Sequence, residues 1–275
     1  MSVEEFFDLF EKELKSNPEL TGYHRLVNSA KMYEFRRAYM EQRMRFVARW
    51  IGDEPAKIWD VGCGFGTTAF FLALNGHKVV GTTLEYYYEG ISKRRKYWEQ
   101  FGDLSSLEFE YKNIFSEEHE AENYDFIVAQ DTLHHLEPFA EAVKIFHKVL
   151  RPGGKIVVSE ENGSNVFTRI RHIKERGFKR IVEVYDEKLD EHFLLGNENT
   201  RSLRKWKKEF SIMPFEFDED SIEYIRYFFP GKYRSTEREK VIAEEQRIWR
   251  KNTVKREYFF FGMNFVIDKR GGSAE

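Results

Sequence analysis

Three glycines and two carboxylates in the first third of the chain are spaced for binding a nucleoside. Gly62, Gly64 and Gly66 follow directly on Asp60 in the run DVGCGFG. Glycines let the backbone turn tightly and let a ligand lie against it without obstruction by side chains. Glu85 follows about 20 residues later, where a carboxylate can accept hydrogen bonds from both hydroxyls of a ribose. This spacing predicts a nucleoside-binding loop.

The same loop distinguishes two kinds of nucleoside cofactor. A dinucleotide fingerprint has its third glycine one position later, where this chain has Thr67. Asp60 would repel a pyrophosphate, whereas a cationic ligand would be attracted to it. S-adenosylmethionine carries a sulfonium, an ammonium group and a ribose, so acids at Asp60 and Glu85 suit it better than NAD.

A second group of reactive side chains lies in the run QDTLHHLEP, which offers Asp131, His134 and His135. Imidazole titrates near neutral pH, and this suits removal of a proton from a hydroxyl that is to be modified. We expect His134 or His135 to act as such a base. The alternative, that these histidines only satisfy backbone groups, stays open.

The apolar pattern predicts the elements that position both groups. Short apolar runs alternate with amphipathic stretches, and we expect strands over residues 57–61, 77–85, 107–114, 124–130 and 155–161. Strands that alternate with helices need crossover connections, which predicts a parallel sheet with helices on both faces. The loop after the first strand and the histidines after the fourth then share the carboxyl edge of the sheet, where ligands bind.

The remaining segments suggest additions to this core. Residues 1–50 read as a helical cap, and residues 51–275 as one catalytic domain with lid insertions near 162–199 and 228–256. The first insertion shows no clear period. A helix should begin near residue 200, and helices should fill most of 231–256. Further strands are expected over 215–225 and 258–268. Tyr23, Tyr33 and the run 226–233 are candidate pocket residues.

In order, DVGCGFG, GTTLE, YDFIVAQDTLHHL and LRPGGKIVVSEEN resemble the successive motifs of class I S-adenosylmethionine-dependent methyltransferases. The resemblance covers about residues 57–161. It implies a Rossmann-like α/β fold, a seven-stranded and mostly parallel sheet with helices on both faces. The strands over 215–225 and 258–268 would be the antiparallel sixth and seventh strands of that fold.

The resemblance also implies roles for individual residues. Asp60 would hold the ammonium group of S-adenosylmethionine, Glu85 the ribose hydroxyls, and Tyr86 would flank the adenine. Asn113 stands where the family often has an acid that accepts from the adenine amino group. The whole expected cofactor set is Asp60, Gly62, Cys63, Gly64, Gly66, Glu85, Tyr86, Asn113, Ile114 and Gln130.

Composition excludes several other functions. The formal net charge is −3, so no general basic field indicates nucleic acid. Cys63 is the only cysteine, which excludes disulfide scaffolds and mechanisms that need two thiols. The basic run 201–208 is explained by an amphipathic helix on Leu203, Trp206 and Phe210. No metal-ligand spacing emerges, so we expect no metal, and no apolar run is long enough for a membrane helix.

These observations predict a cytoplasmic methyltransferase that uses S-adenosylmethionine and leaves S-adenosylhomocysteine. Its acceptor should be a small, hydrophobic molecule methylated at oxygen, with no nucleic acid and no membrane insertion. The sequence leaves open N- or C-methylation of a natural product or lipid precursor, RNA modification, and a non-catalytic S-adenosylmethionine-binding protein.

Overall fold

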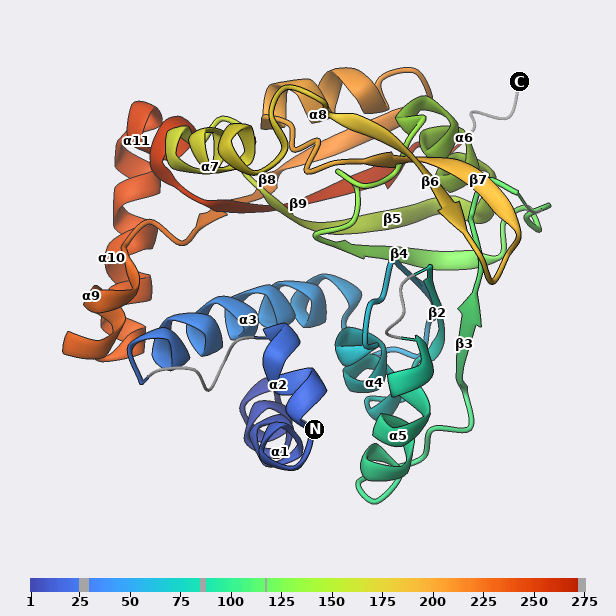
Figure 1. Cartoon of the computed structure of the whole chain (residues 1–275), viewed down its shortest axis with the longest axis horizontal. Helices are drawn as coiled ribbons and strands as arrows, with labels where there is room; N and C mark the ends of the chain where they lie inside the picture. Colours follow the sequence, from blue (N-terminus) through green and yellow to red (C-terminus); the bar gives the residue numbers. More distant parts are fainter. Residues whose placement is uncertain (25–29, 85–87, 117, 272–275) are drawn as a thin grey trace.

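A seven-stranded sheet with the order β3-β2-β1-β4-β5-β9-β8 forms the centre of the molecule (Figure 1). The computed structural model describes residues 1–24, 30–84, 88–116 and 118–271. The sheet strands are β1 (Lys57–Val61), β2 (Lys78–Thr83), β3 (Leu107–Tyr111), β4 (Tyr124–Gln130), β5 (Leu150–Glu161), β8 (Phe215–Ile225) and β9 (Gly262–Lys269). The predicted class of fold is therefore confirmed.

The direction of the strands corrects one expectation. Strands β1 to β5 are parallel, and β9 pairs antiparallel with both β5 and β8. Because β8 opposes β9, it runs in the same direction as β5. Only one of the two strands expected to be antiparallel therefore runs against the rest.

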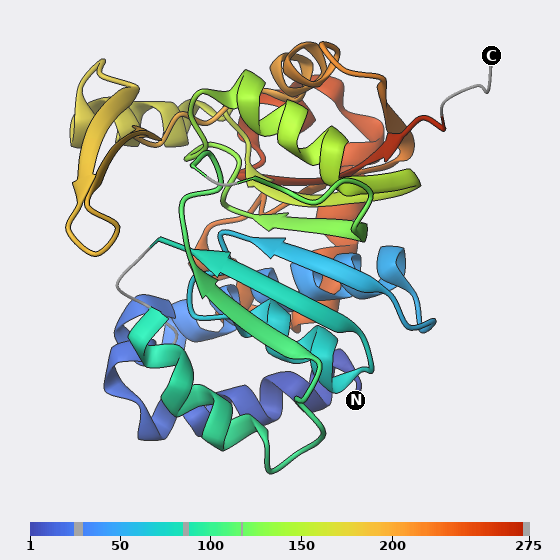
Figure 2. The ribbon, with the colours of Figure 1, turned by 90° about the vertical axis from the view of Figure 1, so that its right-hand side faces the viewer.

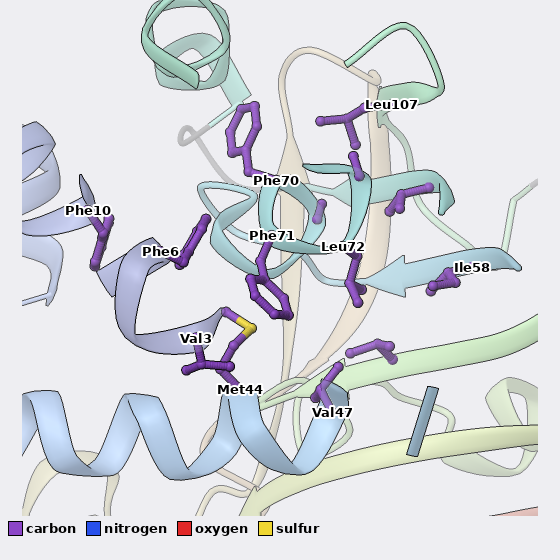
Figure 3. Packing of buried hydrophobic residues seen from close by; sticks show 14 of the residues in the cluster. Val3, Phe6, Phe10, Met44, Val47, Ile58, Phe70, Phe71, Leu72 and Leu107 are labelled. Atoms are coloured by element: carbon purple, nitrogen blue, oxygen red, sulfur yellow. The ribbon is translucent and has the colours of Figure 1, made fainter. Parts of the chain in front are cut away.

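Side chains that alternate along the strands divide the core into two apolar clusters. Ile58 of β1 belongs to one cluster, and its neighbour Trp59 belongs to the other. The first cluster contains residues of α1 (Val3–Ser16), α2 (Pro18–His24), α3 (Ala30–Ile51), α4 (Thr67–Leu74) and α5 (Tyr88–Trp98). Figure 3 shows Val3, Phe6 and Met44 packed near Phe71 and Leu72 of α4. The opposite face is covered by α6 (Phe139–Val149) and α8 (Leu203–Phe210).

The N-terminal helices are joined to the sheet by a buried ion pair as well as by apolar packing. Glu13 of α1 and Arg94 of α5 lie 2.8 Å apart, and both side chains are almost wholly buried. The indole nitrogen of Trp98 also donates to Glu13 at 3.0 Å. Residues 1–16 therefore pack as part of the first cluster, together with strands of the sheet.

The segment 162–199 contains regular elements that the sequence does not predict. It forms α7 (Val166–Arg176) and an antiparallel hairpin of β6 (Ile181–Asp186) and β7 (Glu191–Gly196). The hairpin extends away from the main sheet, as Figure 2 shows. The absence of a clear period in the sequence therefore does not mean an absence of regular structure.

The later insertion is helical, as predicted. It contains α9 (Pro230–Ser235), α10 (Arg238–Lys251) and α11 (Thr253–Phe259), and α9 and α10 pack against α3. Strand β9 begins at Gly262 rather than at residue 258, because α11 continues to Phe259. Within the described ranges, no helix has both the length and the apolar character needed to cross a bilayer.

Candidate functional site

A cavity of about 850 Å³ opens at the carboxyl ends of the parallel strands. Its floor is formed by the last residues of β1, β2, β4 and β5 and by the residues just after β3. Residues of α2, α3 and α7, the end of β7 and the loop that follows it complete the walls. The cavity thus lies where an open parallel sheet is expected to bind its ligand.

The glycine loop forms one end of this cavity, and its conformation requires glycine. Gly62 and Gly66 have φ angles of 67° and 73°, in the left-handed region that favours glycine. A Cβ on Gly62 would lie 2.3 Å from Cγ2 of Thr132, and one on Gly66 would lie 2.6 Å from the Phe109 ring. Gly64 lies between them with a φ of 53°.

Arg94 holds this glycine loop in place through hydrogen bonds. Its Nη1 donates to the carbonyl oxygen of Phe65 at 2.6 Å and to Oγ1 of Thr67 at 2.9 Å. The same guanidinium forms the buried pair with Glu13. The shape of the loop therefore depends on an arginine and a glutamate that the motif itself does not contain.

Asp60, the last residue but one of β1, lies in the cavity with an acceptor that remains available. The side chain is 2% exposed, and its Oδ2 has no hydrogen-bond partner among the described residues. Burial raises the pKa of this carboxyl to about 7. The Nε2 of Gln130, at the end of β4, likewise has no partner within the described part of the chain. A buried acceptor and a buried donor in one cavity fit a ligand with an ammonium group and polar oxygens.

The other expected cofactor residues fall into two groups. Glu85 and Tyr86 lie outside the described residues. Cys63, Asn113 and Ile114 line the cavity. Burial, with the charge of Asp60, raises the pKa of the Cys63 thiol well above its usual value, so the thiol is a poor nucleophile. The Asn113 carboxamide holds its own loop, because Oδ1 accepts from Phe115 N at 3.1 Å and Nδ2 donates to Ser116.

Asp131 is held in place by an arginine from a distant helix. Nη1 of Arg43, in α3, donates to Oδ2 of Asp131 at 2.5 Å. Asp131 has a φ of 51°, and its Oδ1 has no partner among the described atoms. The sequence offers no local signal for Arg43, because this pair joins residues 88 positions apart.

The two histidines after β4 face different partners. Nδ1 of His134 donates to Oε2 of Glu160 at 2.6 Å. Burial alone would lower the pKa of His134, but the charge of Glu160 and this hydrogen bond raise it to about 9. Nδ1 of His135 donates to the carbonyl oxygen of Gly196 at 2.8 Å. Burial and the nearby His134 lower the pKa of His135, which favours its neutral form with a lone pair on Nε2.

Several charged residues complete this side of the cavity, and of these the sequence singles out Glu161, at the end of the fifth expected strand. Glu161, Arg171, Glu175 and Glu198 line it beside the histidines. Hydrogen bonds from His172 and Arg171 overcome the effect of burial and lower the pKa of Glu161 to about 2. The β6–β7 hairpin brings Glu198 to this place, and residues 181–196 do not alternate regularly between polar and apolar types, so the sequence offers no local signal for it.

Of the other candidate pocket residues, some line the cavity and some lie in other parts of the molecule. Tyr23 lines the cavity, whereas the hydroxyl of Tyr33 donates to Glu11 and accepts from Arg37. Among the described residues, none from 226–233 is in the lining.

In α8, Trp206 and Phe210 are buried, as an amphipathic helix requires. Basic side chains from 169–180 and from 201–208 line a second cavity of about 380 Å³.

The profile of a family described as "Methyltransferase domain" matches residues 32–218. Phosphoethanolamine N-methyltransferase 1 of Zea mays is 26% identical over 64% of this chain and 36% of that protein. Ubiquinone biosynthesis O-methyltransferase of Aeromonas salmonicida is 26% identical over 41% of this chain and 48% of that protein. The chain thus spans about a third to a half of the length of these curated relatives.

Solved structures are similar in fold. A putative sarcosine dimethylglycine methyltransferase from Galdieria sulphuraria has a TM-score of 0.57, with 14% identity over 84% of this chain and 86% of that one. Phosphoethanolamine N-methyltransferase 2 from Haemonchus contortus, solved in complex with S-adenosyl-L-methionine, has a TM-score of 0.54 and 14% identity. That match covers 84% of this chain and 52% of the other.

Proposed function

We propose a function that starts from one premise: this chain belongs to the methyltransferase-domain family, and its fold is that of the class I S-adenosylmethionine-dependent methyltransferases. The cofactor of this family is S-adenosylmethionine. The function we propose is transfer of its methyl group to a small-molecule acceptor, at oxygen. The buried carboxylate of Asp60, one oxygen of which has no partner among the described residues, is the observation that carries the proposal.

The residues of the cavity fit this cofactor. Asp60 offers an acceptor for the ammonium group, and Gln130 offers a donor for the carboxylate of the methionine portion. Gly62 and Gly66 leave bare backbone against which the ligand can lie. When bound, the cofactor supplies a methyl group on a positively charged sulfur. The protein's contribution is to align the acceptor with that sulfur and to exclude water from both.

The lining of the other half of the cavity favours a polar acceptor. Arg43, Asp131, Glu161, Arg171 and Glu198 are all charged and all face the same space. An apolar acceptor would displace water from these charged groups without offering them a polar contact, which costs free energy. We therefore propose a small polar acceptor with a hydroxyl group, in place of the hydrophobic one expected from the sequence.

Oxygen is proposed as the methylated atom because two imidazoles and the Glu198 carboxylate meet on the acceptor side. These groups can bind or orient a hydroxyl, and His135, whose pKa is lowered by burial and by His134, can accept the proton of that hydroxyl. The phosphoethanolamine N-methyltransferases among the relatives make methylation at nitrogen the second candidate.

Calorimetric titration with S-adenosylhomocysteine tests the cofactor assignment. The wild-type chain should bind one equivalent, and Asp60→Asn should bind at least about 10-fold more weakly, the effect of losing a charged hydrogen bond. Asp220→Asn removes an exposed carboxylate and is the matched control. Equal affinity of Asp60→Asn and the wild type would overturn the assignment.

Incubation with methyl-labelled S-adenosylmethionine and panels of polar hydroxylated, polar amino and apolar hydroxylated compounds tests the acceptor. Mass spectrometry of the products should find the label as a methyl ether or ester. A methylamine would replace oxygen by nitrogen as the acceptor atom. Label confined to apolar compounds would contradict the proposed polar acceptor.

A further inference from the structure

We propose that His134, His135 and Glu198 form a binding site for one divalent transition-metal cation of the Zn²⁺ type. The site lies on the acceptor side of the cavity. This inference reverses the expectation that the chain holds no metal. The inference deepens the proposed function. It rests on that function in one respect, because we assign the open coordination position of the cation to the acceptor's hydroxyl oxygen.

The three side chains converge on one point. One ligand atom from each lies within 4.8 Å of the others. The Nε2 of His134 is 3.8 Å from Oε2 of Glu198. Ligands bonded to one zinc at about 2.1 Å are separated by roughly 3.5 Å in a tetrahedral site. Glu198 is 38% exposed, so its carboxylate has room to move the short distance that closes the set.

Both imidazoles are oriented in the way that metal-ligating histidines usually are. Such histidines donate the N–H of the other ring nitrogen to a carboxylate or a backbone carbonyl, which fixes the ring and its tautomer. Here the Nδ1 atom of His134 donates to Glu160, and that of His135 donates to the carbonyl oxygen of Gly196. Each ring therefore has its Nε2 left for the cation.

Glu160 itself is held firmly. It is 1% exposed, and its Oε1 accepts the backbone N–H of Leu133 at 2.6 Å while its Oε2 accepts from His134. This buried carboxylate holds the backbone at Leu133 and also orients the imidazole of His134. The position of His134 is therefore rigid.

The backbone brings Glu198 to the histidines. The Gly196 amide donates to the carbonyl oxygen of His135 at 2.9 Å, and Leu136 and Leu195 form an isolated β-bridge. A Cβ on Gly196 would lie only 1.9 Å from the carbonyl oxygen of His134, so glycine permits this approach. Farther along, Glu137 accepts from Asn199 and, at 2.7 Å, from Arg201. The end of β7 is thus fixed to the segment after β4 on both sides of Glu198.

A neighbouring triad is the weaker candidate. Glu161, His172 and Glu198 also lie close together, with separations of 3.3 Å and 3.4 Å. However, Arg171 lies against both Glu161 and His172, with its Nη2 2.9 Å from Nε2 of His172. That guanidinium already supplies the positive charge at this place, so the cation belongs at the first triad.

The ligand set indicates the class of metal and its use. Two imidazoles and one carboxylate suit zinc and similar cations, whereas Mg²⁺ and Ca²⁺ prefer oxygen ligands. Three protein ligands leave a fourth position open. A hydroxyl oxygen bound there would become more acidic, would release its proton to solvent in the cavity, and would be fixed in space for attack on the methyl group.

Titration of the chelator-treated chain, residues 1–275, with Zn²⁺ tests the site. We expect one Zn²⁺ per chain, and Co²⁺ in its place should give visible absorption bands that Zn²⁺ abolishes. Glu198→Gln should weaken Zn²⁺ binding more than about 100-fold, because loss of a ligand should exceed the 10–100-fold loss typical of a supporting residue. Glu160→Gln should fall within that 10–100-fold range. His192→Gln, which removes an exposed histidine of β7, is the control and should bind as the wild type does.

S-adenosylhomocysteine binding measured on every variant shows whether each is folded and separates the two proposals. Zinc binding in the wild type that neither Glu198→Gln nor His135→Gln weakens would overturn the site. A chain that binds S-adenosylhomocysteine through Asp60 but takes up no zinc would also overturn the site, and it would leave the proposed function standing. A chain that binds zinc but not S-adenosylhomocysteine would overturn the proposed function alone.

Discussion

A single carboxyl group shows how burial changes the chemistry of a residue. Asp60 is buried at the end of a strand with no cation beside it among the described residues, and its pKa is raised to about 7. An ammonium group that arrives beside this carboxyl favours its charged form. Cofactor binding and ionisation of Asp60 are therefore linked.

Affinity for S-adenosylhomocysteine should rise with pH and level off just above neutrality. Below pH 7 the free protein carries a protonated Asp60, and binding must release that proton. Two pH units below the pKa only about 1% of the group is ionised, so binding near pH 5 should be up to about 100-fold weaker than near pH 8. Calorimetry across this range measures the slope, and Asp60→Asn should flatten it. A wild-type affinity that does not vary with pH would contradict the linkage.

At the scale of elements, buried ion pairs and close backbone contacts determine where the loops lie. Arg94 joins α1, α5 and the glycine loop through its contacts with Glu13, Phe65 and Thr67. Gly196 brings the end of β7 against the backbone of the histidines. Each of these residues joins segments that lie far apart in the sequence.

Glu13→Gln should lower the free energy of unfolding by about 3–5 kcal/mol, because it leaves the buried Arg94 without its counter-charge. Urea denaturation measures this loss. Glu141→Gln breaks an exposed pair with Lys144 on α6 and should cost only about 0–1 kcal/mol. Similar losses in the two variants would show that the Glu13–Arg94 pair does not stabilise the fold as we expect.

Gly196→Ala should displace the end of β7, since the new methyl group has no space beside the His134 carbonyl. We expect a loss of about 1–3 kcal/mol in thermal unfolding and weaker Zn²⁺ binding. Gly271→Ala is the matched control, because nothing lies within 4 Å of its Cβ position. A variant with unchanged stability and unchanged zinc affinity would refute the close approach.

For the molecule as a whole, the N-terminal helices and the sheet share one core. Phe6, Phe7, Phe10 and Leu14 are all at most 2% exposed, and they belong to the same apolar cluster as Ile58 and Val79 of the sheet. Figure 3 shows how closely the side chains of α1 approach α4. The cap and the sheet therefore depend on each other for burial.

Removal of residues 1–17 should abolish cooperative unfolding. Each of the four buried side chains contributes about 1.5–3 kcal/mol, so their sum is comparable with the roughly 5–15 kcal/mol by which a native domain is stable. Circular dichroism during heating measures the transition, and removal of residues 272–275 is the control. A shortened chain that melts as sharply as the full one would show that the sheet folds without α1.

Much of the core was predictable from the sequence because its strands are continuous apolar runs. Strands such as β1 and β4 can therefore be predicted without knowledge of tertiary contacts. The β6–β7 hairpin escapes prediction because Ile181 and Tyr185 are exposed while Asp186 is partly buried, which obscures the usual alternation. The glycine loop is a local motif, whereas Arg43 and Glu198 reach the cavity only through folding. The spacing of residues along the chain therefore predicts the cofactor half of the cavity better than the acceptor half.

The β6–β7 hairpin stands apart from the main sheet, and its attachments to the segment after β4 include one β-bridge and the backbone contacts of Gly196 (Figure 2). A hairpin that stands apart in this way is suited to exchange between related proteins. A homologous hairpin could be transplanted onto this scaffold to alter which acceptors are accepted, while the half of the protein that holds the methyl donor is left untouched.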